Sequence, residues 1–396
     1  MEKMPLPSAV IFIMERLGSH CYQAHAVGGC VRDFLLGREI GDYDLTTSAT
    51  PEQMKEVFSD CRTIETGIKH GTVSVCIDRV PYEVTTYRTD GEYKDNRHPE
   101  TVSFTSSLAE DLARRDFTVN AICYNPKDGY TDLFGGREDL SRGLIRAVGE
   151  PHRRFGEDAL RIMRAVRFSA TLGFSVEEKT AAAVHELRHL LSNIAPERIH
   201  TELKKLMAGE GAYGVLAEFW DVIAVFLPEL RCMKLPERAL FDRADPTSRI
   251  LSLFYLSCDS PASAYGDAMR RLRCDNSTRT HGEKVLSALD GLELCDVRGA
   301  LLSLMRYGED TVRGALRLGV LLGRYGQSEA AVLDSALSSG IPYELSGLDL
   351  RGGDVSSLGY YGYKVGERLD FLLRAVIEGK CENDRAALIT YLTQNR

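Results

Sequence analysis

The chain has 396 residues, of which 44% are hydrophobic and 27% are charged, and its formal net charge is −8. This composition excludes a disordered chain and a fibrous repeat, and the acidic balance argues against a nonspecific nucleic-acid coat. At roughly 150 residues per domain, the length predicts two to four domains. No apolar run is long enough to cross a bilayer and the ten cysteines form no CxxC pair, so we expect a soluble, cytoplasmic protein with reduced, buried thiols.

The predicted elements divide the chain into a mixed head and a helical remainder. Up to about residue 140, short β-rich runs alternate with Gly and Asp turns, among them GTVSVCI, YEVTTYR and TVNAICYN. From about residue 151 onward the pattern is helical, with amphipathic segments separated by Gly, Pro or Asn. Residues 141–210 carry 12 Lys and Arg against 9 Asp and Glu, so a polyanionic partner is expected to meet this segment.

The first segment with chemical character is AVGGCVRDFLLGREIGDYDLTTSAT, residues 26–50. A short apolar strand runs into Gly28 and Gly29, and the helix start that follows offers free N–H groups that, with Arg32, suit a phosphate. Asp42 and Asp44 flank one residue at a predicted strand start, where side chains at i and i+2 share a face and can share divalent cations. An isolated DxD is usually a solvated turn, but the combination favours nucleoside triphosphate chemistry.

A second segment, EDLARRDFTVNAICY, spans residues 110–124. Arg114 and Arg115 precede Asp116, and a strand is predicted through Asn120 to Tyr124. Arg115 is placed to reach a triphosphate, and Asp116 or Asn120 to bind a ribose hydroxyl, because carboxylates and amides are the partners that a hydroxyl needs. A surface charge pair that caps a strand explains this segment equally well.

The third segment, RRFGEDALRIMRAVRF, residues 153–168, predicts one amphipathic helix. Its apolar face carries Ala159, Ile162, Met163, Val166 and Ala170. Its polar face carries Glu157, Asp158, Arg161, Arg164 and Arg167. Asp158 and Arg161 are i and i+3 neighbours, so both can point into one space and read the Watson–Crick edge of a nucleobase. Intrahelical ion pairs are the simpler interpretation of this segment taken alone.

A competing motif is HELRH, formed by His185, Glu186 and His189, which matches the HExxH pattern of zinc hydrolases. The surroundings are rich in Lys and Arg, which is a poor place to gather a dication. Glu210 is a weak candidate for a third ligand. Two solvated histidines are the preferred interpretation, and a zinc hydrolase is kept as a remote alternative.

Taken together, the segments resemble those of the class II tRNA nucleotidyltransferases of the polymerase-β-like superfamily, which include CCA-adding enzymes and bacterial poly(A) polymerases. In the family's order, the resemblance is carried by GGCVRDFLLGREIGDYD, TGIKHGTV, RRDFTVNA, DLFGGREDL, RFGEDALRIMRAVRF and PERIHTELKKL. The end of the chain, from SGLDLRGGDV onward, is similar to the tail of bacterial CCA-adding enzymes, with the usual Gly and Pro pattern changed to LGYYGYKVG.

The resemblance implies an α+β fold in which an N-terminal mixed-sheet nucleotidyltransferase head is followed by an all-helical neck, body and tail. The expected domains are a catalytic head at residues 1–140, a neck with the base-selecting helix at 141–210, a body at 211–340 and a tRNA-binding tail at 341–396.

The resemblance also implies a role for each candidate residue. The metal ligands and catalytic residues would be Asp42 and Asp44. The triphosphate would be held by Gly29, Arg32 and Arg115, with Asp116 near the ribose. Asp158 and Arg161 match the EDxxR positions that pair with the incoming base, and Arg164 and Arg167 match further nucleotide-binding arginines. Glu83, in YEVTTYR, is a candidate third acidic group.

The implied activity is template-independent addition of CCA to the 3′ end of tRNA, from CTP and ATP, with Mg²⁺ as cofactor. The stretch from about Arg88 to Phe104 is similar to a flexible loop that the family uses to change from C to A addition, and its ordinary length favours full CCA addition. An A-adding enzyme or poly(A) polymerase of the same superfamily is the nearer alternative, disfavoured because no basic C-terminal extension is present. A noncatalytic tRNA-binding protein is a further one. No membrane partner is expected, and the sequence does not predict the oligomeric state.

Overall fold

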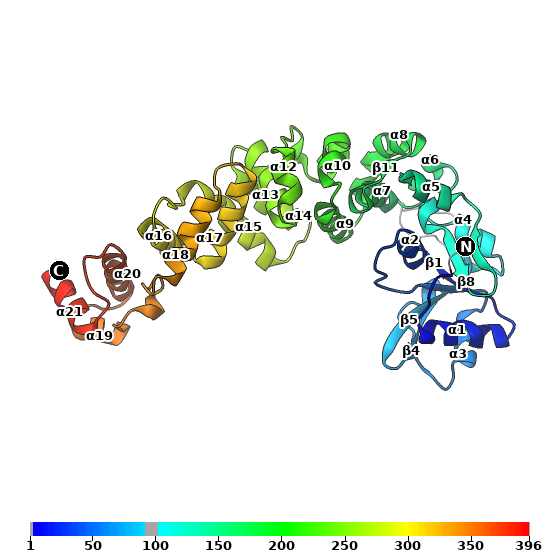
Figure 1. Cartoon of the computed structure of the whole chain (residues 1–396), viewed down its shortest axis with the longest axis horizontal. Coiled ribbons are helices and arrows are strands. Elements are labelled where there is room, and N and C mark those ends of the chain that lie inside the picture. The colour runs from blue at the N-terminus through cyan, green and yellow to red at the C-terminus, as the bar shows by residue number, and fades with distance from the viewer. Residues whose placement is uncertain (1–2, 92–101, 396) are drawn as a thin grey trace. The chain divides into compact units, whose positions relative to one another are not determined.

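The computed structural model describes residues 3–91 and 102–395, and the chain forms two compact units, Met1–Pro228 and Glu229–Arg396. Figure 1 shows strands in the first part of the chain and helices throughout the rest. Within the described residues, none of the helices combines the length and the apolar character that a membrane span requires. All ten cysteines are free thiols, but only Cys30, Cys123 and Cys274 are buried. Cys21, Cys232 and Cys295 are exposed, which corrects the prediction that the thiols are buried.

The first unit is built on a mixed sheet whose strands lie in the order β3-β4-β5-β2-β1-β8-β9. These strands are β1 Ala24–Val27, β2 Leu45–Thr47, β3 Arg62–Ile64, β4 Thr72–Ile77, β5 Val80–Thr86, β8 Ile122–Asn125 and β9 Gly129–Asp132. β2 and β5 are parallel, whereas the other neighbouring pairs are antiparallel. Two short pairs lie outside this sheet: β6 Arg88–Asp90 with β7 Val102–Phe104, and β10 Leu144–Ile145 with β11 Ser175–Val176.

The burial pattern explains why these residues form the sheet. In β4, Val73 and Val75 are buried while Thr72 and Ser74 are partly exposed, which is the alternation of a strand with one covered face. β1 is buried along its whole length because β2 and β8 flank it. Helices α1 (Ser8–Ser19) and α3 (Pro51–Val57) pack beside the sheet (Figure 1). The central position of β1 fixes the turn that follows it.

The remaining helices of the first unit follow or interrupt the strands. They are α2 Gly29–Leu35, α4 Leu108–Ala113, α5 Gly136–Arg142, α6 Pro151–Glu157, α7 Leu160–Leu172, α8 Glu178–Leu187, α9 Pro196–Ala208, α10 Ala212–Glu218 and α11 Trp220–Phe226. Short 3-10 helices span Ile68–His70, Thr118–Asn120 and Arg188–Asn193. α7 packs against α9 and α10, and α6 packs against α8.

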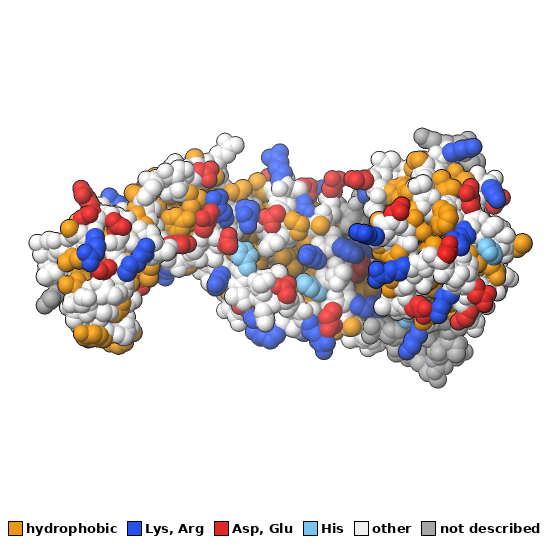
Figure 2. Space-filling model, turned by 90° about the horizontal axis from the view of Figure 1, so that it is seen from below, with side chains coloured by type: hydrophobic (Ala, Val, Ile, Leu, Met, Phe, Trp, Pro, Cys, Tyr) orange, Lys and Arg blue, Asp and Glu red, His pale blue; other side chains and the backbone are white. Residues whose placement is uncertain are grey.

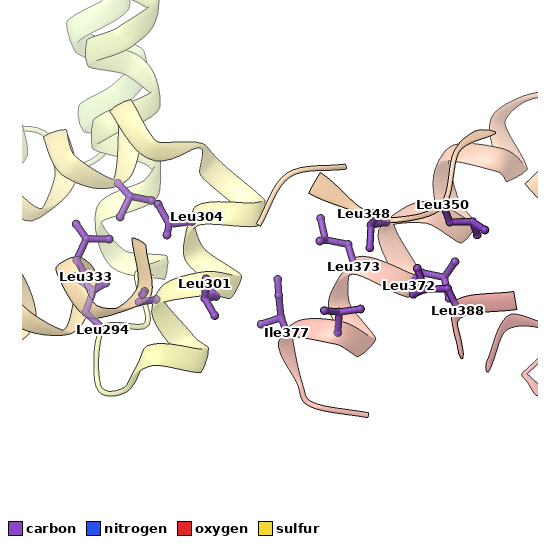
Figure 3. Packing of buried hydrophobic residues seen from close by; sticks show 14 of the residues in the cluster. Leu294, Leu301, Leu304, Leu333, Leu348, Leu350, Leu372, Leu373, Ile377 and Leu388 are labelled. Carbon is purple, nitrogen blue, oxygen red and sulfur yellow. The ribbon is translucent and has the colours of Figure 1, made fainter. Parts of the chain in front are cut away.

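The second unit is helical throughout the part of the chain that the structure describes. Its helices are α12 Arg238–Arg243, α13 Pro246–Ser257, α14 Pro261–Arg271, α15 Asn276–Ala288, α16 Val297–Tyr307, α17 Glu309–Leu321, α18 Gln327–Ser338, α19 Gly352–Ser357, α20 Tyr363–Ile377 and α21 Arg385–Gln394. One leucine-rich core joins α16 and α18 to the C-terminal helices, and Figure 3 shows Leu301 and Leu304 facing Leu373 and Ile377. Burial of such side chains contributes on the order of 2 kcal/mol each.

The structure confirms the α+β fold and corrects three local predictions. Residues 153–168 do not form one helix: α6 ends at Glu157, Asp158 is extended (φ −133°, ψ 105°), and α7 begins at Leu160. Asp42 and Asp44 lie just before β2 rather than within it. The strand predicted through Asn120 begins only at Ile122, after a 3-10 turn. The boundaries of the four predicted domains stay predictions.

Candidate active site

The glycine turn at the end of β1 brings the backbone close to an arginine. Gly28 has φ +76°, a conformation that favours glycine, and Gly29 begins α2. A Cβ at Gly28 would lie 3.2 Å from Nη1 of Arg115. The backbone N–H of Gly28 donates to the carbonyl of Ile122 at 3.3 Å, which ties the turn to β8. A side chain at this position would therefore displace the arginine.

The two predicted metal ligands lie beside this turn. The carbonyl of Asp44 accepts from the N–H of Val27 at 3.0 Å, so the backbone of Asp44 continues the pairing of β1 with β2. Both aspartates have exposed side chains. Partial desolvation raises the pKa of Asp44, Arg115 opposes this rise, and the charge of Asp42 adds to it. The charges of Asp42 and Arg115 therefore both act on the carboxylate of Asp44.

Glu83 is near this pair in the ladder but does not complete a three-residue cluster. Leu45 pairs with Val84 in the parallel β2–β5 ladder, which puts Glu83 one position before that pair. Among residues 3–91 and 102–395, no group of three or more His, Cys, Asp or Glu side chains is arranged to hold a metal ion.

Arg32 is held from two sides. Its Nη1 donates to Oδ1 of Asn120 at 2.7 Å, and its Nε and Nη2 donate to the carboxylate of Asp33 at 2.9 Å. Because Asn120 comes from the 3-10 turn before β8, the predicted first and second segments meet here. Asn120 is thus occupied by Arg32 rather than open to a ribose.

Asp116 and Arg164 form a buried ion pair. Arg164 Nε donates to Oδ2 of Asp116 at 2.7 Å, while Oδ1 accepts from the N–H of Phe117 and from Asn120. Burial alone would raise the pKa of Asp116, but the charge of Arg164 and the hydrogen bond from Asn120 lower it to about 2. Asp116 is therefore ionised at neutral pH and joins the head to α7.

Three arginines surround the ring of Phe168. The guanidinium carbons of Arg32, Arg164 and Arg167 lie 5.2, 5.2 and 3.5 Å from the ring centroid. Arg167 also donates to Glu202 of α9 at 2.8 Å. Sequence reasoning missed Phe168 and Glu202, although the RxxRF pattern in α7 was a local signal for the former. Together these contacts gather the predicted arginines of α2 and α7.

Asp158 and Arg161 are close in sequence but are not bonded to each other. Oδ1 of Asp158 accepts from the N–H of Leu160 at 3.0 Å, and Oδ2 lies 3.5 Å from Nη2 of Arg198. Arg161 is buried; it pairs with Glu157 at 2.8 Å and donates to the backbone carbonyls of residues 154 and 114. The break before α7 explains this separation, since i,i+3 proximity requires a continuous helix.

The HELRH segment does not form a zinc site. α8 ends at Leu187, so His189 lies in a 3-10 helix rather than one α-helical turn beyond His185. Nδ1 of His185 lies 3.0 Å from Asp221, and Glu186 pairs with His152 at 2.7 Å. With these partners and the absence of a metal-binding group among the described residues, the zinc-hydrolase alternative is wrong.

Comparison with known protein families gives two matches. Residues 24–146 match the family described as Poly A polymerase head domain. Residues 173–233 match the family described as probable RNA and SrmB-binding site of polymerase A. The first match contains the glycine turn, both aspartates and Arg115, whereas Arg164 and Arg167 of α7 follow it in the chain.

Proteins that match this chain over nearly its whole length are CCA-adding enzymes. The CCA-adding enzyme of Lactobacillus delbrueckii subsp. bulgaricus is 37% identical over 386 residues, covering 96% of each chain. That of Enterococcus faecalis is 34% identical over 396 residues, covering 97% of this chain and 95% of the relative. A solved Bacillus stearothermophilus CCA-adding enzyme in complex with CTP is 32% identical, with a TM-score of 0.82 over 99% of this chain and 98% of that one.

A Thermotoga maritima CCA-adding enzyme complexed with tRNA shares the fold, with a TM-score of 0.71 at 19% identity over 99% of this chain and 97% of that one. The head sheet, the glycine turn and the paired carboxylates define a nucleotidyltransferase. The chain belongs to the CCA-adding enzymes of that class.

Proposed function

We propose that the chain adds C, C and A to the 3′ end of tRNA from CTP and ATP, without a nucleic-acid template. The observation that carries this proposal is the convergence of the glycine turn, Asp42 and Asp44, and the arginines of α2 and α7 within one compact unit. The tRNA 3′ hydroxyl attacks the α-phosphorus of the nucleotide. A phosphodiester bond forms, the bond from the α-phosphorus to the bridging oxygen breaks, and pyrophosphate leaves.

We propose Mg²⁺ as the divalent ion, held by Asp42 and Asp44. Two neighbouring, solvent-accessible carboxylates offer the hard oxygen donors that Mg²⁺ prefers, with the remaining positions left to phosphate oxygens and water. When bound, the ion would lower the pKa of the attacking hydroxyl and offset charge on the leaving oxygens. Arg115 also bears on Asp44, because its positive charge opposes the rise in the pKa of that carboxyl.

Arg32 and Arg115 would hold the triphosphate over the turn at Gly28 and Gly29. Both side chains are anchored by carboxylates, which leaves fewer conformations to be lost when a nucleotide binds. Asp116, held by Asn120 and Arg164, would lie near the ribose. Arg164 and Arg167 would add positive charge from α7. Positioning of this kind can recover about 7 to 11 kcal/mol of a barrier.

Base selection would fall to Asp158 and Arg161. Oδ2 of Asp158 lies 3.5 Å from Nη2 of Arg198, whereas Oδ1 accepts from the N–H of Leu160 at 3.0 Å. Oδ2 is therefore the oxygen that would accept from an exocyclic amine of cytosine or adenine. Arg161 would supply donors to the base edge from its place between Glu157 and the backbone of residue 114. The carboxylate would accept a hydrogen bond from the exocyclic amine, and the guanidinium would donate to the acceptors on the base edge, so the pair suits both cytosine and adenine.

The helical part of the chain would bind the tRNA. The head would then carry catalysis, the neck base selection, and the tail tRNA binding, with the body between neck and tail. The match of residues 173–233 to a family described as a probable RNA-binding site supports this assignment. The stretch from Arg88 to Phe104 is expected to change the enzyme from C to A addition. Residues 92–101 of this stretch lie outside the described residues. Ten free thiols suit a cytoplasmic location, where glutathione keeps cysteines reduced.

The decisive experiment incubates tRNA lacking its terminal CCA with Mg²⁺ and labelled CTP, ATP or both, and counts the added residues. Stepwise addition of C, C and A supports the proposal. Addition of CC alone, of one A, or of a long A tract would contradict it and identify a different transferase. Binding of tRNA without release of pyrophosphate would indicate a noncatalytic protein.

The metal assignment is tested in the same assay with Asp42→Asn and Asp44→Asn. Both variants should lose turnover with every nucleotide and stay folded, because the exposed carboxylates contribute little to packing. Asp78→Asn is the matched control, since Asp78 is an exposed carboxylate at the turn between β4 and β5. Near-normal incorporation by either of the first two variants would refute the assignment.

A further inference from the structure

A carboxylate that sequence reasoning passed over, Asp111, lies fully buried in α4 beside the active site. Its relative exposure is 0%, and a buried carboxylate is stable only when it is paired and hydrogen-bonded. Arg114 Nε and Nη2 donate to its Oδ1 at 2.9 and 2.8 Å. Burial acts to raise the pKa of Asp111, but Arg114 and Arg115 outweigh it and the pKa is lowered. The group is therefore a charged carboxylate inside the head.

The second oxygen of Asp111 joins two parts of the proposed site. Oδ2 accepts from the hydroxyl of Thr46 at 3.1 Å and lies 3.4 Å from Nη2 of Arg115. Thr46 is the second residue after Asp44 and lies in the middle of β2. A single oxygen thus bonds the strand that follows the metal ligands and the arginine that faces the glycine turn.

Arg115 has donors left over for a ligand. Its Nη1 points at the glycine turn, 3.2 Å from where a Cβ of Gly28 would lie. Its Nε is buried and has no hydrogen-bond partner among the described residues. A buried N–H without an acceptor costs about 1 to 3 kcal/mol of stability. Another interaction must therefore hold the guanidinium of Arg115 in this position. The contact with Asp111 is the ion pair that holds it.

We propose that Asp111 is a positioning residue for nucleotidyl transfer, which fixes Arg115 against the glycine turn in register with Asp44 and so sets the affinity for the triphosphate. This inference rests on the proposed function and deepens it. Because CTP and ATP share the triphosphate, the effect is independent of the base. It also extends to pyrophosphate, which leaves from the same place.

The experiment compares Asp111→Asn with Asp139→Asn. Asp139 is a matched control: it is 4% exposed, accepts from the hydroxyl of Thr118 at 2.7 Å, and pairs with Arg146 at 3.1 Å in the same unit. Asp111→Asn should raise KM for CTP and ATP by one common factor of about ten to a hundred, as loss of a supporting partner does elsewhere. The inhibition constant of pyrophosphate should rise by the same factor, with kcat and inhibition by cytidine changed much less.

Several outcomes overturn the inference. They are a KM in Asp111→Asn equal to that in Asp139→Asn, a change for only one nucleotide, or unchanged pyrophosphate inhibition. Should Asp111→Asn fail to fold, Thr46→Val keeps the carboxylate and removes the hydroxyl that donates to it, together with that hydroxyl's contact with the carbonyl of Thr85, and the same shifts are expected at smaller size. Should the wild-type chain add no nucleotide, the proposed function fails, while calorimetric binding of pyrophosphate still decides the role of Asp111.

Discussion

At the residue scale, the arginines of the site are paired with carboxylates before any nucleotide arrives. Arg32 pairs with Asp33, Arg164 with Asp116 and Arg167 with Glu202. A guanidinium has five N–H donors, so one carboxylate leaves several for phosphate or base. The pairing holds each planar group in place and keeps the unliganded site from concentrating positive charge. A bound triphosphate would thus meet directed donors rather than mobile ones.

The pair formed by Asp116 and Arg164 makes the first unit sensitive to acid. The pKa of Asp116 is lowered from 3.8 to about 2, so this carboxylate stabilises the folded state above pH 4, and the contribution is lost as pH falls toward 2. The shift corresponds to on the order of 2 kcal/mol. Wild type should therefore exceed Asp116→Asn in unfolding free energy by a constant amount from pH 7 to 5, and by less below pH 4.

Urea unfolding at each pH, followed by the fluorescence of Trp220, measures this difference. Trp220 is the one tryptophan in the sequence and belongs to the first unit, so its signal reports that unit. Asp78→Asn, at an exposed turn, serves as the control and should follow the wild-type curve. A gap between wild type and Asp116→Asn that does not change between pH 6 and 3 would show that the pair does not titrate as described.

At the element scale, the break between α6 and α7 decides what Asp158 can do. Asp158 is extended, so its side chain caps the start of α7 by accepting from the N–H of Leu160. Ala159, Ile162 and Met163, which all follow Asp158, are buried. Helical periodicity therefore predicted the buried face correctly and gave no sign of the interruption.

The cap allows a structural role of Asp158 to be separated from base selection. Asp158→Ala should destabilise the first unit by about 1 kcal/mol, because a helix-start N–H loses its acceptor. Asp158→Asn keeps an acceptor oxygen and should unfold like wild type, yet relax the preference for CTP and ATP over UTP and GTP. Unfolding curves and incorporation of each nucleotide are compared for both variants. Unchanged nucleotide preference in Asp158→Asn would exclude Asp158 from base reading.

The same contrast shows what could be predicted from the sequence. Local signals were sufficient for the glycine turn, the strand alternation of Val73 and Val75, and the acidic pair before β2, because each is written within a few residues. The bond between Thr46 and Asp111 spans 65 positions, and that between Arg167 and Glu202 spans 35. Such pairings depend on how the sheet and helices pack, which spacing along one chain does not specify.

At the scale of the whole molecule, each of the two compact units contains buried apolar clusters. In the second unit, Leu301, Leu304 and Leu373 belong to a core formed by residues between 294 and 392 (Figure 3). In the first unit, Val27, Leu112 and Cys123 form a buried cluster. On the face drawn in Figure 2, basic and acidic side chains are interspersed, in keeping with the net charge of −8. Recognition of RNA therefore depends on local sets of side chains rather than on overall charge.

The division into two compact units predicts that they unfold in separate steps. Leu301→Ala and Ile162→Ala each empty a site that is 0% exposed, in the second and first unit respectively, and each should cost about 2 to 5 kcal/mol. Leu301→Ala should shift a helix transition seen by far-UV circular dichroism and leave the Trp220 transition in place, whereas Ile162→Ala should shift the Trp220 transition. Each variant is the control for the other. If both substitutions moved both signals together, the chain would unfold as one cooperative body and the division at Pro228 would carry no energetic meaning.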